Sequence, residues 1–201
     1  MGEAGEAGDV VNLGIGIPTR VADHLDPAHP VVLQTENGML GVGPSPAEAD
    51  VDPLLVNAGK LPVTERPGAS YFSSSQSFAM IRGGHVDVAV LGALQIDARG
   101  RIANWSVPGQ PILGVGGAMD LLVGARRVIV ATTHRTKAGE PKLVPECAYP
   151  LTADRPADVV VTEHATFAVR DGGLVLVEVA PGTSREWVRE HTAAPFAEAI
   201  A

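Results

Sequence analysis

One carboxylate in the sequence stands where a nucleophile or a general base could act. Glu36 follows an apolar strand predicted over residues 31–33 and precedes Asn37 and Gly38, a pair that favours a tight turn. In α/β folds, ligands bind in the crevice beyond the carboxyl ends of the strands. A carboxylate at that place can serve as a nucleophile, a base or a metal ligand. Spacing alone still favours the plainer interpretation, an exposed glutamate in a turn.

Two glycine-rich loops could approach an anionic ligand. Residues 114–117 (GVGG) run into a predicted helix, where main-chain N–H groups and the helix N-terminus could hold a pyrophosphate or stabilise an oxyanion. The loop is no dinucleotide fingerprint, because Met119 stands where the third glycine would fall, and it lacks the Gly-Lys-Ser/Thr of a P-loop. Gly14 and Gly16 form the second loop, whose main-chain N–H groups could approach an anionic ligand in the same way. For both loops a plain turn is an equal interpretation.

Other reactive side chains lack a supporting pattern. The six histidines are not paired at metal-site spacing and Cys147 has no second cysteine, so we expect no metal site. The serines at 73–75 lie outside a GxSxG elbow, which argues against a hydrolase triad. Lys60, Arg82 and Lys137 are the candidates for meeting an anionic substrate, although each is more typical of a solvated surface charge.

Composition narrows the classes of protein. The 201 residues are 45% hydrophobic and 19% charged, with 23 glycines and 16 prolines, which is typical of a packed globular protein with many tight connections. The formal net charge of -8 argues against general nucleic-acid or membrane-surface binding. A single cysteine fits a reducing compartment, and no apolar run approaches the ~20 residues that cross a bilayer. We therefore expect a cytoplasmic protein.

The elements that must position these side chains alternate between strand and helix patterns. We expect strands at residues 10–13, 31–33, 86–91, 96, 101–107, 127–132, 159–162, 166–169 and 174–179, and helices at 18–27, 75–82, 118–123 and 184–191. This alternation predicts an α/β fold, a mainly parallel sheet flanked by helices with some added β-meander. Residues 1–10 are expected to form a flexible N-terminus and residues 11–201 a single domain. The stretch 39–66 is predicted to be one long loop, of a kind that is often functional.

Six segments taken together resemble family I CoA transferases, in which they occur in the same order. They are VNLGIGIP (11–18), TENG (35–38), VNAGK (56–60), SFAMIRGGHVD (77–87), GGAMDL (116–121) and APG (180–182). The resemblance is to the B (beta) subunit of 3-oxoacid or 3-oxoadipate CoA transferases and runs from about Val11 to the C-terminus. It implies a fold similar to the CoA-transferase and ribose-phosphate isomerase group. It also implies a chain that moves coenzyme A between carboxylic acids, succinyl-CoA and a 3-oxoacid such as acetoacetate.

The resemblance implies roles for individual residues. Glu36 would attack the acyl-CoA thioester to give an acyl-glutamyl anhydride, and would then carry CoA as a glutamyl thioester until a second carboxylate takes it over. No permanently bound cofactor and no metal is implied, only coenzyme A as a cosubstrate. An A (alpha) subunit would complete the active site, so we expect a hetero-oligomer, although the isolated chain could self-associate. The residues implied to bind CoA or substrate, or to hold an oxyanion, are Gly14, Gly16, Asn37, Gly38, Asn57, Lys60, Gly116, Gly117 and Ala118.

The sequence departs from the family pattern near the second glycine loop. Gln110 and Leu113 stand where lysines are common, which puts CoA affinity or substrate choice in question. Thr35 replaces the usual serine and keeps its hydroxyl, and Gln76 replaces an aspartate. Two alternatives therefore stay open: an acyl-CoA hydrolase derived from the same fold, in which water intercepts the anhydride, and a non-catalytic chain that binds CoA or its partner. Neither nucleic acid nor membrane is an expected partner.

Overall fold

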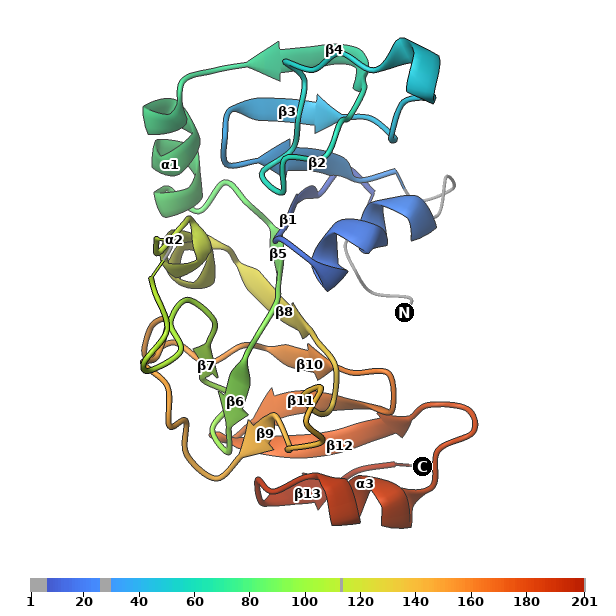
Figure 1. The fold of residues 1–201 in the computed structure, drawn as a ribbon, viewed down its shortest axis with the longest axis vertical. Helices are drawn as coiled ribbons and strands as arrows, with labels where there is room; N and C mark the ends of the chain where they lie inside the picture. Colours follow the sequence, from blue (N-terminus) through green and yellow to red (C-terminus); the bar gives the residue numbers. More distant parts are fainter. Residues whose placement is uncertain (1–6, 26–29, 113, 201) are drawn as a thin grey trace.

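A ten-stranded sheet carries the fold (Figure 1). The computed structural model describes residues 7–25, 30–112 and 114–200, and within them the strand order is β13-β12-β11-β10-β8-β5-β1-β2-β3-β4, beside a three-stranded sheet of order β7-β6-β9. The strands are β1 (Val10–Leu13), β2 (Val32–Thr35), β3 (Met39–Val42), β4 (Glu65–Tyr71), β5 (Val88–Leu91), β6 (Gln95–Asp97), β7 (Ile102–Ala103), β8 (Arg127–Ala131), β9 (Leu143–Val144), β10 (Val159–Val161), β11 (Ala165–Arg170), β12 (Gly173–Val179) and β13 (Phe196–Glu198). The helices are α1 (Ser74–Arg82), α2 (Ala118–Gly124) and α3 (Arg185–His191), with 3-10 helices η1 (Ile17–His24) and η2 (Glu48–Asp50).

The centre of the large sheet is parallel. β2, β1, β5, β8 and β10 lie side by side and point the same way. β3 and β4 extend one end by antiparallel pairing, and β11 and β12 extend the other. Parallel neighbours need crossover connections, and η1, α1 and α2 lie in those crossovers. The predicted α/β fold with a mainly parallel sheet is confirmed.

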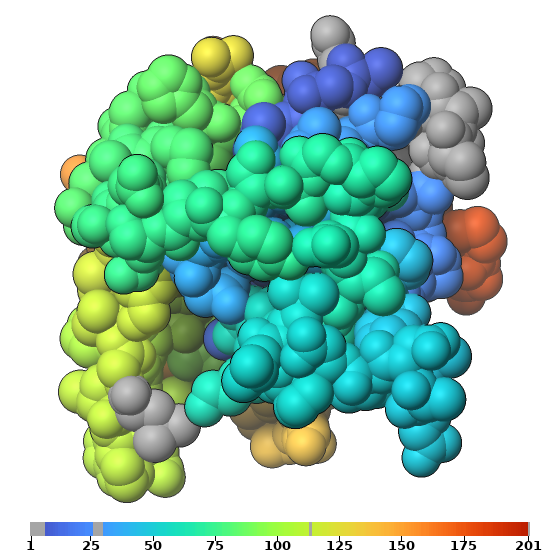
Figure 2. All heavy atoms as spheres, turned by 90° about the horizontal axis from the view of Figure 1, so that it is seen from above, coloured from blue at the N-terminus to red at the C-terminus, as the bar shows by residue number. Residues whose placement is uncertain are grey.

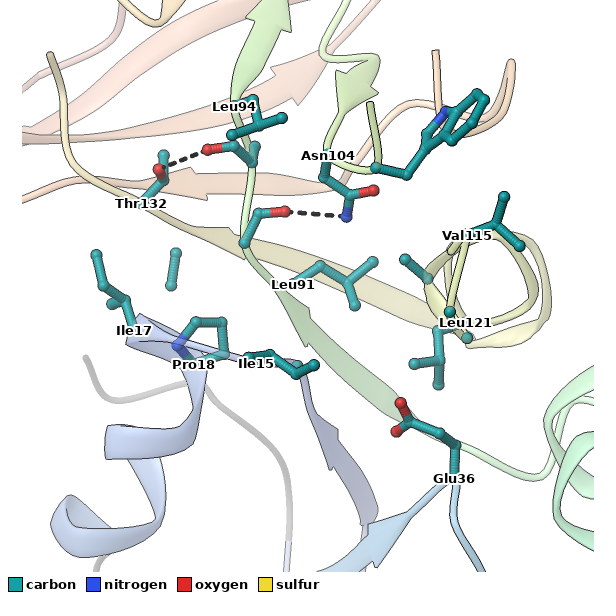
Figure 3. A pocket seen from close by; sticks show the side chains of 18 of the residues that line it. Ile15, Ile17, Pro18, Glu36, Leu91, Leu94, Asn104, Val115, Leu121 and Thr132 are labelled. Carbon is teal, nitrogen blue, oxygen red and sulfur yellow. Dashed lines mark hydrogen bonds between the residues drawn. The ribbon is translucent and has the colours of Figure 1, made fainter. Parts of the chain in front are cut away.

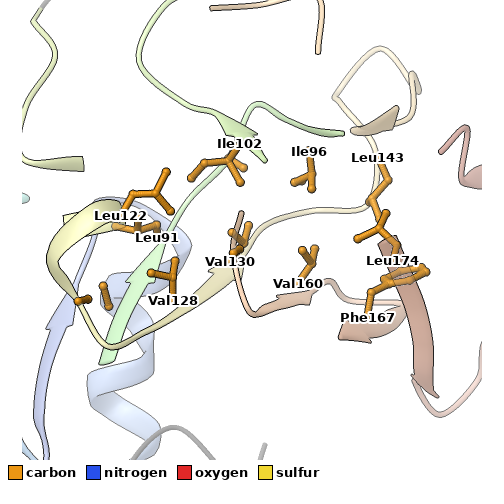
Figure 4. Close-up of a cluster of buried hydrophobic side chains, with 14 of the residues drawn as sticks. Leu91, Ile96, Ile102, Leu122, Val128, Val130, Leu143, Val160, Phe167 and Leu174 are labelled. Atoms are coloured by element: carbon orange, nitrogen blue, oxygen red, sulfur yellow. The ribbon is translucent and has the colours of Figure 1, made fainter. Parts of the chain in front are cut away.

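The larger hydrophobic core lies between the large sheet and the layer formed by α1, α2, α3 and the small sheet. Its buried members include Leu91, Val128, Val130, Val160, Phe167 and Leu174 from the large sheet, Ile96, Ile102 and Leu143 from the small sheet, and Leu122 from α2 (Figure 4). Burying one such side chain stabilises the fold by roughly 1.5–3 kcal/mol. This core therefore holds α2 firmly against the strands.

A second hydrophobic core lies on the opposite face of the parallel strands. Val11, Val88 and Val90 belong to it, and Val21 and Ala22 of η1 pack against it. Strands covered on both faces need apolar residues at successive positions, which explains why the four residues of β5 (VAVL) are all buried. Figure 1 shows the blue helix η1 on one side of the sheet and α1 and α2 next to each other on the other side.

The start and the end of α1 are both fixed by side chains. Ser73 Oγ accepts a hydrogen bond from the Gln76 N–H (3.3 Å), and the Gln76 side chain accepts one from the Ser73 N–H (3.0 Å), which completes a capping box. Gln76, a departure from the family pattern, thus has a local structural role. At the other end, Arg82 Nε donates to Asp120 Oδ1 of α2 (2.6 Å), and this hydrogen bond raises the pKa of Arg82. Arg82 therefore ties α1 to α2.

The predicted loop over residues 39–66 was wrong in part, because β3 and the start of β4 lie within it. β3 folds back on β2, pairing Leu40 with Gln34 across the turn at Asn37 and Gly38. Four residues are too few to display a period, so only the tertiary pairing reveals this strand. β4 is one of the two edge strands of the large sheet. Pro67 lies in it and is exposed, a position where proline disturbs no ladder.

Several predicted boundaries also moved. The segment expected to be a helix from residue 18 is the 3-10 helix η1, and its predicted end at 26–27 lies outside the described residues. The predicted strand 101–107 is reduced to β7, and β9 and β13 had not been predicted. Residues 1–6 lie outside the described residues, whereas the Val10 N–H donates to Asp87 Oδ2 (2.9 Å) at the start of β1. No helix in the described ranges is long and apolar enough to cross a membrane.

Candidate active site

The carboxyl ends of four neighbouring parallel strands meet at one edge of the sheet. The residues that directly follow β1, β2, β5 and β8 are Gly14, Glu36, Gly92 and Thr132. Parallel strands end at the same edge, so residues from distant parts of the sequence gather there. Glu36 thus lies at the edge of the sheet where its position after an apolar strand had placed it.

A pocket of about 420 Å³ opens at this edge, a volume within the range of small-molecule sites. Its walls are the strand ends, the start of η1, Trp105 and the loop that leads into α2. Among the described residues that line it, Glu36 is the only titratable one. In Figure 3 the Glu36 carboxylate points from the end of β2 into the pocket, with Leu91, Leu121 and Val115 beyond it. Figure 2 shows the lime-green loop before α2 across a recess from the blue segments around β2.

The alternation of β2 decides which way Glu36 points. Successive side chains of a strand face opposite sides, so Glu36 shares its face with Gln34, whereas Leu33 belongs to the second core behind the sheet. Asn12 is the Cα partner of Gln34 on β1, and Asn12 Nδ2 lies 3.5 Å from Glu36 Oε2. Glu36 is half-buried. Its carboxylate therefore has the sheet on one side and the pocket on the other.

Three buried polar residues lie beneath this carboxylate. Asn12 Nδ2 donates to Gln34 Oε1 at 2.6 Å, and Gln34 Nε2 donates to Ser77 Oγ on α1 at 2.8 Å. The exposed fractions of Asn12, Gln34 and Ser77 are 0%, 3% and 0%. Sequence reasoning missed all three. The available signal was polar side chains inside apolar strand patterns, at Asn12 and Gln34, which packing alone does not require.

The loop before α2 faces the other carboxylate oxygen. A Cβ added to Gly117 would lie 3.3 Å from Glu36 Cγ, 3.4 Å from Glu36 Oε1 and 3.3 Å from Phe78 Cζ. Gly117 has φ -88° and ψ -2°, a conformation that any residue can adopt, so space rather than backbone shape calls for glycine here. α2 has only 7 residues. What this loop can offer beside Glu36 is therefore main-chain N–H groups rather than the N-terminus of a long helix.

The pocket brings together five of the ten site residues that the resemblance implied. They are Gly14, Glu36, Gly116, Gly117 and Ala118. At Gly14 an added Cβ would lie 3.0 Å from the Val90 carbonyl oxygen, so β1 and β5 approach closely where the pocket begins.

The other five site residues that the resemblance implied do not line the pocket. Asn37 is exposed and its Nδ2 donates to the Val56 carbonyl (2.9 Å). Gly38 has φ 121°, and an added Cβ would collide with the Phe72 carbonyl oxygen. Asn57 lines a separate cavity of about 270 Å³, where its Oδ1 accepts from the Leu61 N–H (3.1 Å). Lys60 is exposed with φ 61°, and Gly16 has φ 90°. These residues shape the turn after β2 and the neighbouring loops.

The end of the pocket away from Glu36 is polar but carries no charge of its own. Asn104 Nδ2 donates to the Gly92 carbonyl (3.1 Å), and the Thr132 hydroxyl donates to the Ala93 carbonyl (2.9 Å), as the dashed lines in Figure 3 show. Lys142 Nζ donates to Thr132 Oγ1 from behind (2.9 Å), and burial lowers the pKa of this lysine. Within the described ranges, no three or more His, Cys, Asp or Glu side chains cluster in a way that could hold a metal ion.

A model of the coenzyme A transferase family matches residues 6–191 of this sequence. The chain belongs to the coenzyme A transferase family. It is 48% identical over 187 residues to the B subunit of the probable succinyl-CoA:3-ketoacid coenzyme A transferase of Bacillus subtilis. The aligned region covers 93% of this chain and 87% of that relative. It is 49% identical over 189 residues to the beta subunit of the acetate CoA-transferase of Escherichia coli, covering 94% of this chain and 86% of the relative.

Solved structures give the same fold for this coenzyme A transferase family member. The crystal structure of an acyl-CoA transferase from Escherichia coli O157:H7 superposes with a TM-score of 0.76 at 21% identity. It covers 98% of this chain, which spans 41% of that longer one. Glutaconate coenzyme A-transferase of Acidaminococcus fermentans matches with a TM-score of 0.66 at 18% identity. Because both sequence identities are below 25%, these two structures show that the fold is shared and no more.

Of the two family departures near the glycine loop, Gln110 falls on the described residues. Gln110 is exposed, and its N–H donates to the Val107 carbonyl (3.0 Å) in a turn. Leu113 lies outside the described residues. The effect of the missing lysines on CoA affinity stays a prediction.

Proposed function

We propose that this chain is the B subunit of a two-subunit CoA-transferase that moves coenzyme A between succinyl-CoA and a 3-oxoacid, with Glu36 as the covalent nucleophile. The observation that carries the proposal is a carboxylate at the carboxyl edge of the sheet, the only titratable group among the described residues of its pocket. The names of the two bacterial relatives, the B subunit of a succinyl-CoA:3-ketoacid transferase and the beta subunit of an acetate CoA-transferase, support the reaction class.

The proposed reaction exchanges acyl and CoA groups on one carboxylate. A Glu36 oxygen attacks the thioester carbonyl carbon, the C–S bond breaks, and CoA leaves as the thiolate with the electron pair. The thiolate then attacks the Glu36 carbonyl of the mixed anhydride, and the first acid leaves as its carboxylate. The incoming acid reverses both steps. Covalent catalysis of this kind replaces one difficult exchange by easier ones, and the charges balance at each stage without a net proton transfer.

The geometry around Glu36 supports this use of its two oxygens. Oε2 lies beside Asn12 Nδ2 at 3.5 Å, while Oε1 faces Gly117. We assign Oε1 as the attacking oxygen because it lies on the pocket side. The main-chain N–H groups of Gly116, Gly117 and Ala118 are the proposed donors to the oxyanion that forms at the carbonyl carbon. Such donors act best in a site that excludes water.

Exposed apolar side chains at the rim of the pocket support the inference that a second chain binds there. Ile15, Ile17 and Val115 line the pocket and are 67%, 45% and 47% exposed, and apolar rims of this sort mark interaction surfaces. We infer that an A subunit covers them and closes the site. The described lining residues include no Lys or Arg. The phosphates of CoA are therefore proposed to bind outside this pocket, leaving it to the acyl and thiol ends.

The decisive variant is Glu36→Gln, which keeps the size of the side chain and removes the nucleophile. The chain co-expressed with an A subunit of this family should transfer CoA from succinyl-CoA to acetoacetate, and Glu36→Gln should reduce transfer by at least about 10³-fold. Incubation with succinyl-CoA followed by borohydride or hydroxylamine should label the peptide containing Glu36, as mass spectrometry would report. Glu48→Gln, an exposed glutamate of η2, is the matched control and should keep full activity.

Three results would contradict the proposal in different ways. Undiminished transfer by Glu36→Gln removes Glu36 from the chemistry. Release of CoA without any carboxylate acceptor, at the rate of transfer, identifies a hydrolase. Tight CoA binding with no covalent adduct identifies a non-catalytic chain.

A further inference from the structure

The three buried polar residues beneath Glu36 need an explanation beyond folding. Asn12, Gln34 and Ser77 come from β1, β2 and α1, and each is almost completely removed from water. Apolar side chains of similar size would fill the same space at no cost in hydrogen bonding. Asn12 Oδ1 has no hydrogen-bond partner among the described residues. A buried acceptor without a hydrogen bond destabilises the fold, so stability alone does not explain this arrangement.

The contacts allow only one orientation of the two amides. Asn12 Nδ2 is close to three acceptors: Gln34 Oε1 at 2.6 Å, the Gln34 main-chain carbonyl at 3.2 Å and Glu36 Oε2 at 3.5 Å. Turning the Gln34 amide over would bring two donors together, so the Asn12 amide would have to turn as well. Asn12 Oδ1 would then face the main-chain carbonyl and the Glu36 carboxylate, which are both acceptors. The Asn12 amide is therefore locked with its N–H groups toward Glu36.

We propose that Gln34 and Ser77 are positioning residues for Glu36. Ser77 Oγ holds Gln34 Nε2, Gln34 Oε1 holds the Asn12 amide, and that amide holds Oε2 so that Oε1 stays turned to the Gly117 side of the pocket. This inference rests on the proposed function of Glu36. α1 thereby affects the chemistry although it contributes no side chain to the lining of the pocket.

The energetic basis is the sensitivity of a reaction to geometry. The attacking oxygen must meet the thioester carbon along one direction, and a misplacement of about 1 Å can cost about 10²-fold in rate. A single glutamate at the end of a strand has free rotation about its side-chain bonds, which the Asn12 contact limits. Losing one buried hydrogen bond from the series should loosen this restraint by an amount that corresponds to about 3- to 10-fold in rate.

The test uses Ser77→Ala and Gln34→Met in the co-expressed complex. Each should lower kcat, and the single-turnover rate of adduct formation, by about 3- to 10-fold. KM for succinyl-CoA should stay unchanged, and the fraction of chains that finally carry the trapped adduct should stay at the wild-type level. Adding Ser77→Ala to Gln34→Met should lower kcat no further, because Ser77 acts through Gln34. Ser74→Ala, at an exposed position of the same helix, is the matched control.

Three outcomes would overturn the inference. They are a wild-type rate of adduct formation in both variants, a loss confined to the fraction of chains that form adduct, and full additivity in the double variant. The second outcome would mean that the residues support only the fold, which thermal unfolding of the same samples would show as a lowered Tm. A failure of the proposed function would instead appear as unimpaired transfer by Glu36→Gln, so the two ideas fail separately.

Discussion

Replacing Gly117 by alanine tests whether the loop before α2 is shaped around the Glu36 side chain. The added methyl group would lie 3.3 Å from Glu36 Cγ, 3.3 Å from Phe78 Cζ and 3.4 Å from Glu36 Oε1. Carbon atoms pack comfortably at about 3.5–4.0 Å, so Glu36 or the loop must shift by a few tenths of an ångström. Alanine keeps the main-chain N–H of residue 117, so the group that donates to an oxyanion is not removed.

The substitution should separate activity from stability. The backbone at Gly117 suits alanine, and a compatible Gly→Ala change stabilises by about 0.4–1 kcal/mol through the unfolded chain. That gain roughly offsets the cost of the contacts. We therefore expect a free energy of unfolding within about 1 kcal/mol of wild type and a kcat lowered by about 3- to 10-fold, since a misplacement of about 1 Å costs about 10²-fold.

The assay is CoA transfer by the co-expressed complex, with urea unfolding of the isolated chain beside it. Gly173→Ala is the matched control, because the nearest atom to its added Cβ is the Arg170 carbonyl oxygen at 4.0 Å. A Gly117→Ala enzyme with wild-type kcat would refute the claim that glycine makes room for the nucleophile. A variant that fails to fold would refute the claim that the loop tolerates alanine.

Two further predictions concern stability. Gly124→Ala should lower the free energy of unfolding by about 1–3 kcal/mol in urea titrations, because the new Cβ would collide with the Ile81 carbonyl oxygen and separate α2 from α1; a loss no larger than that of Gly173→Ala would contradict this. His134 lies fully buried between the hydroxyls of Thr162 and Thr192, and burial lowers its pKa to about 4. Because an unfolded histidine titrates near 6.5, this stabilisation is complete above about pH 6.5 and is lost as the pH falls toward 4, by up to about 3 kcal/mol. Urea unfolding at pH 7 and pH 4.5 measures the loss, and an equally steep decline in His134→Gln would rule out His134 as its source.

Local patterns in the sequence predicted the framework of the site. Short apolar runs bounded by turn residues, such as that of β5, indicate strands covered on both faces, and the residue after such a strand in a parallel sheet lies at the carboxyl edge. Glu36 lies at that edge, directly after β2. The patterns failed where an element depends on its neighbours: β3 exists because it pairs with β2, and the exposed β4 because it pairs with β3.

The residues that surround Glu36 were decided by tertiary structure. Asn12 and Gln34 are 22 residues apart in sequence, and Gln34 and Ser77 are 43 apart, yet each pair is joined by a hydrogen bond. The sequence by itself determined the strand that ends at Glu36 and the turn that follows, because both depend on side-chain period and on residues a few positions apart. Only the packing of α1 and the loop before α2 onto the sheet decided what meets the carboxylate. Those contacts depend on how separate elements are buried together, which no local spacing encodes.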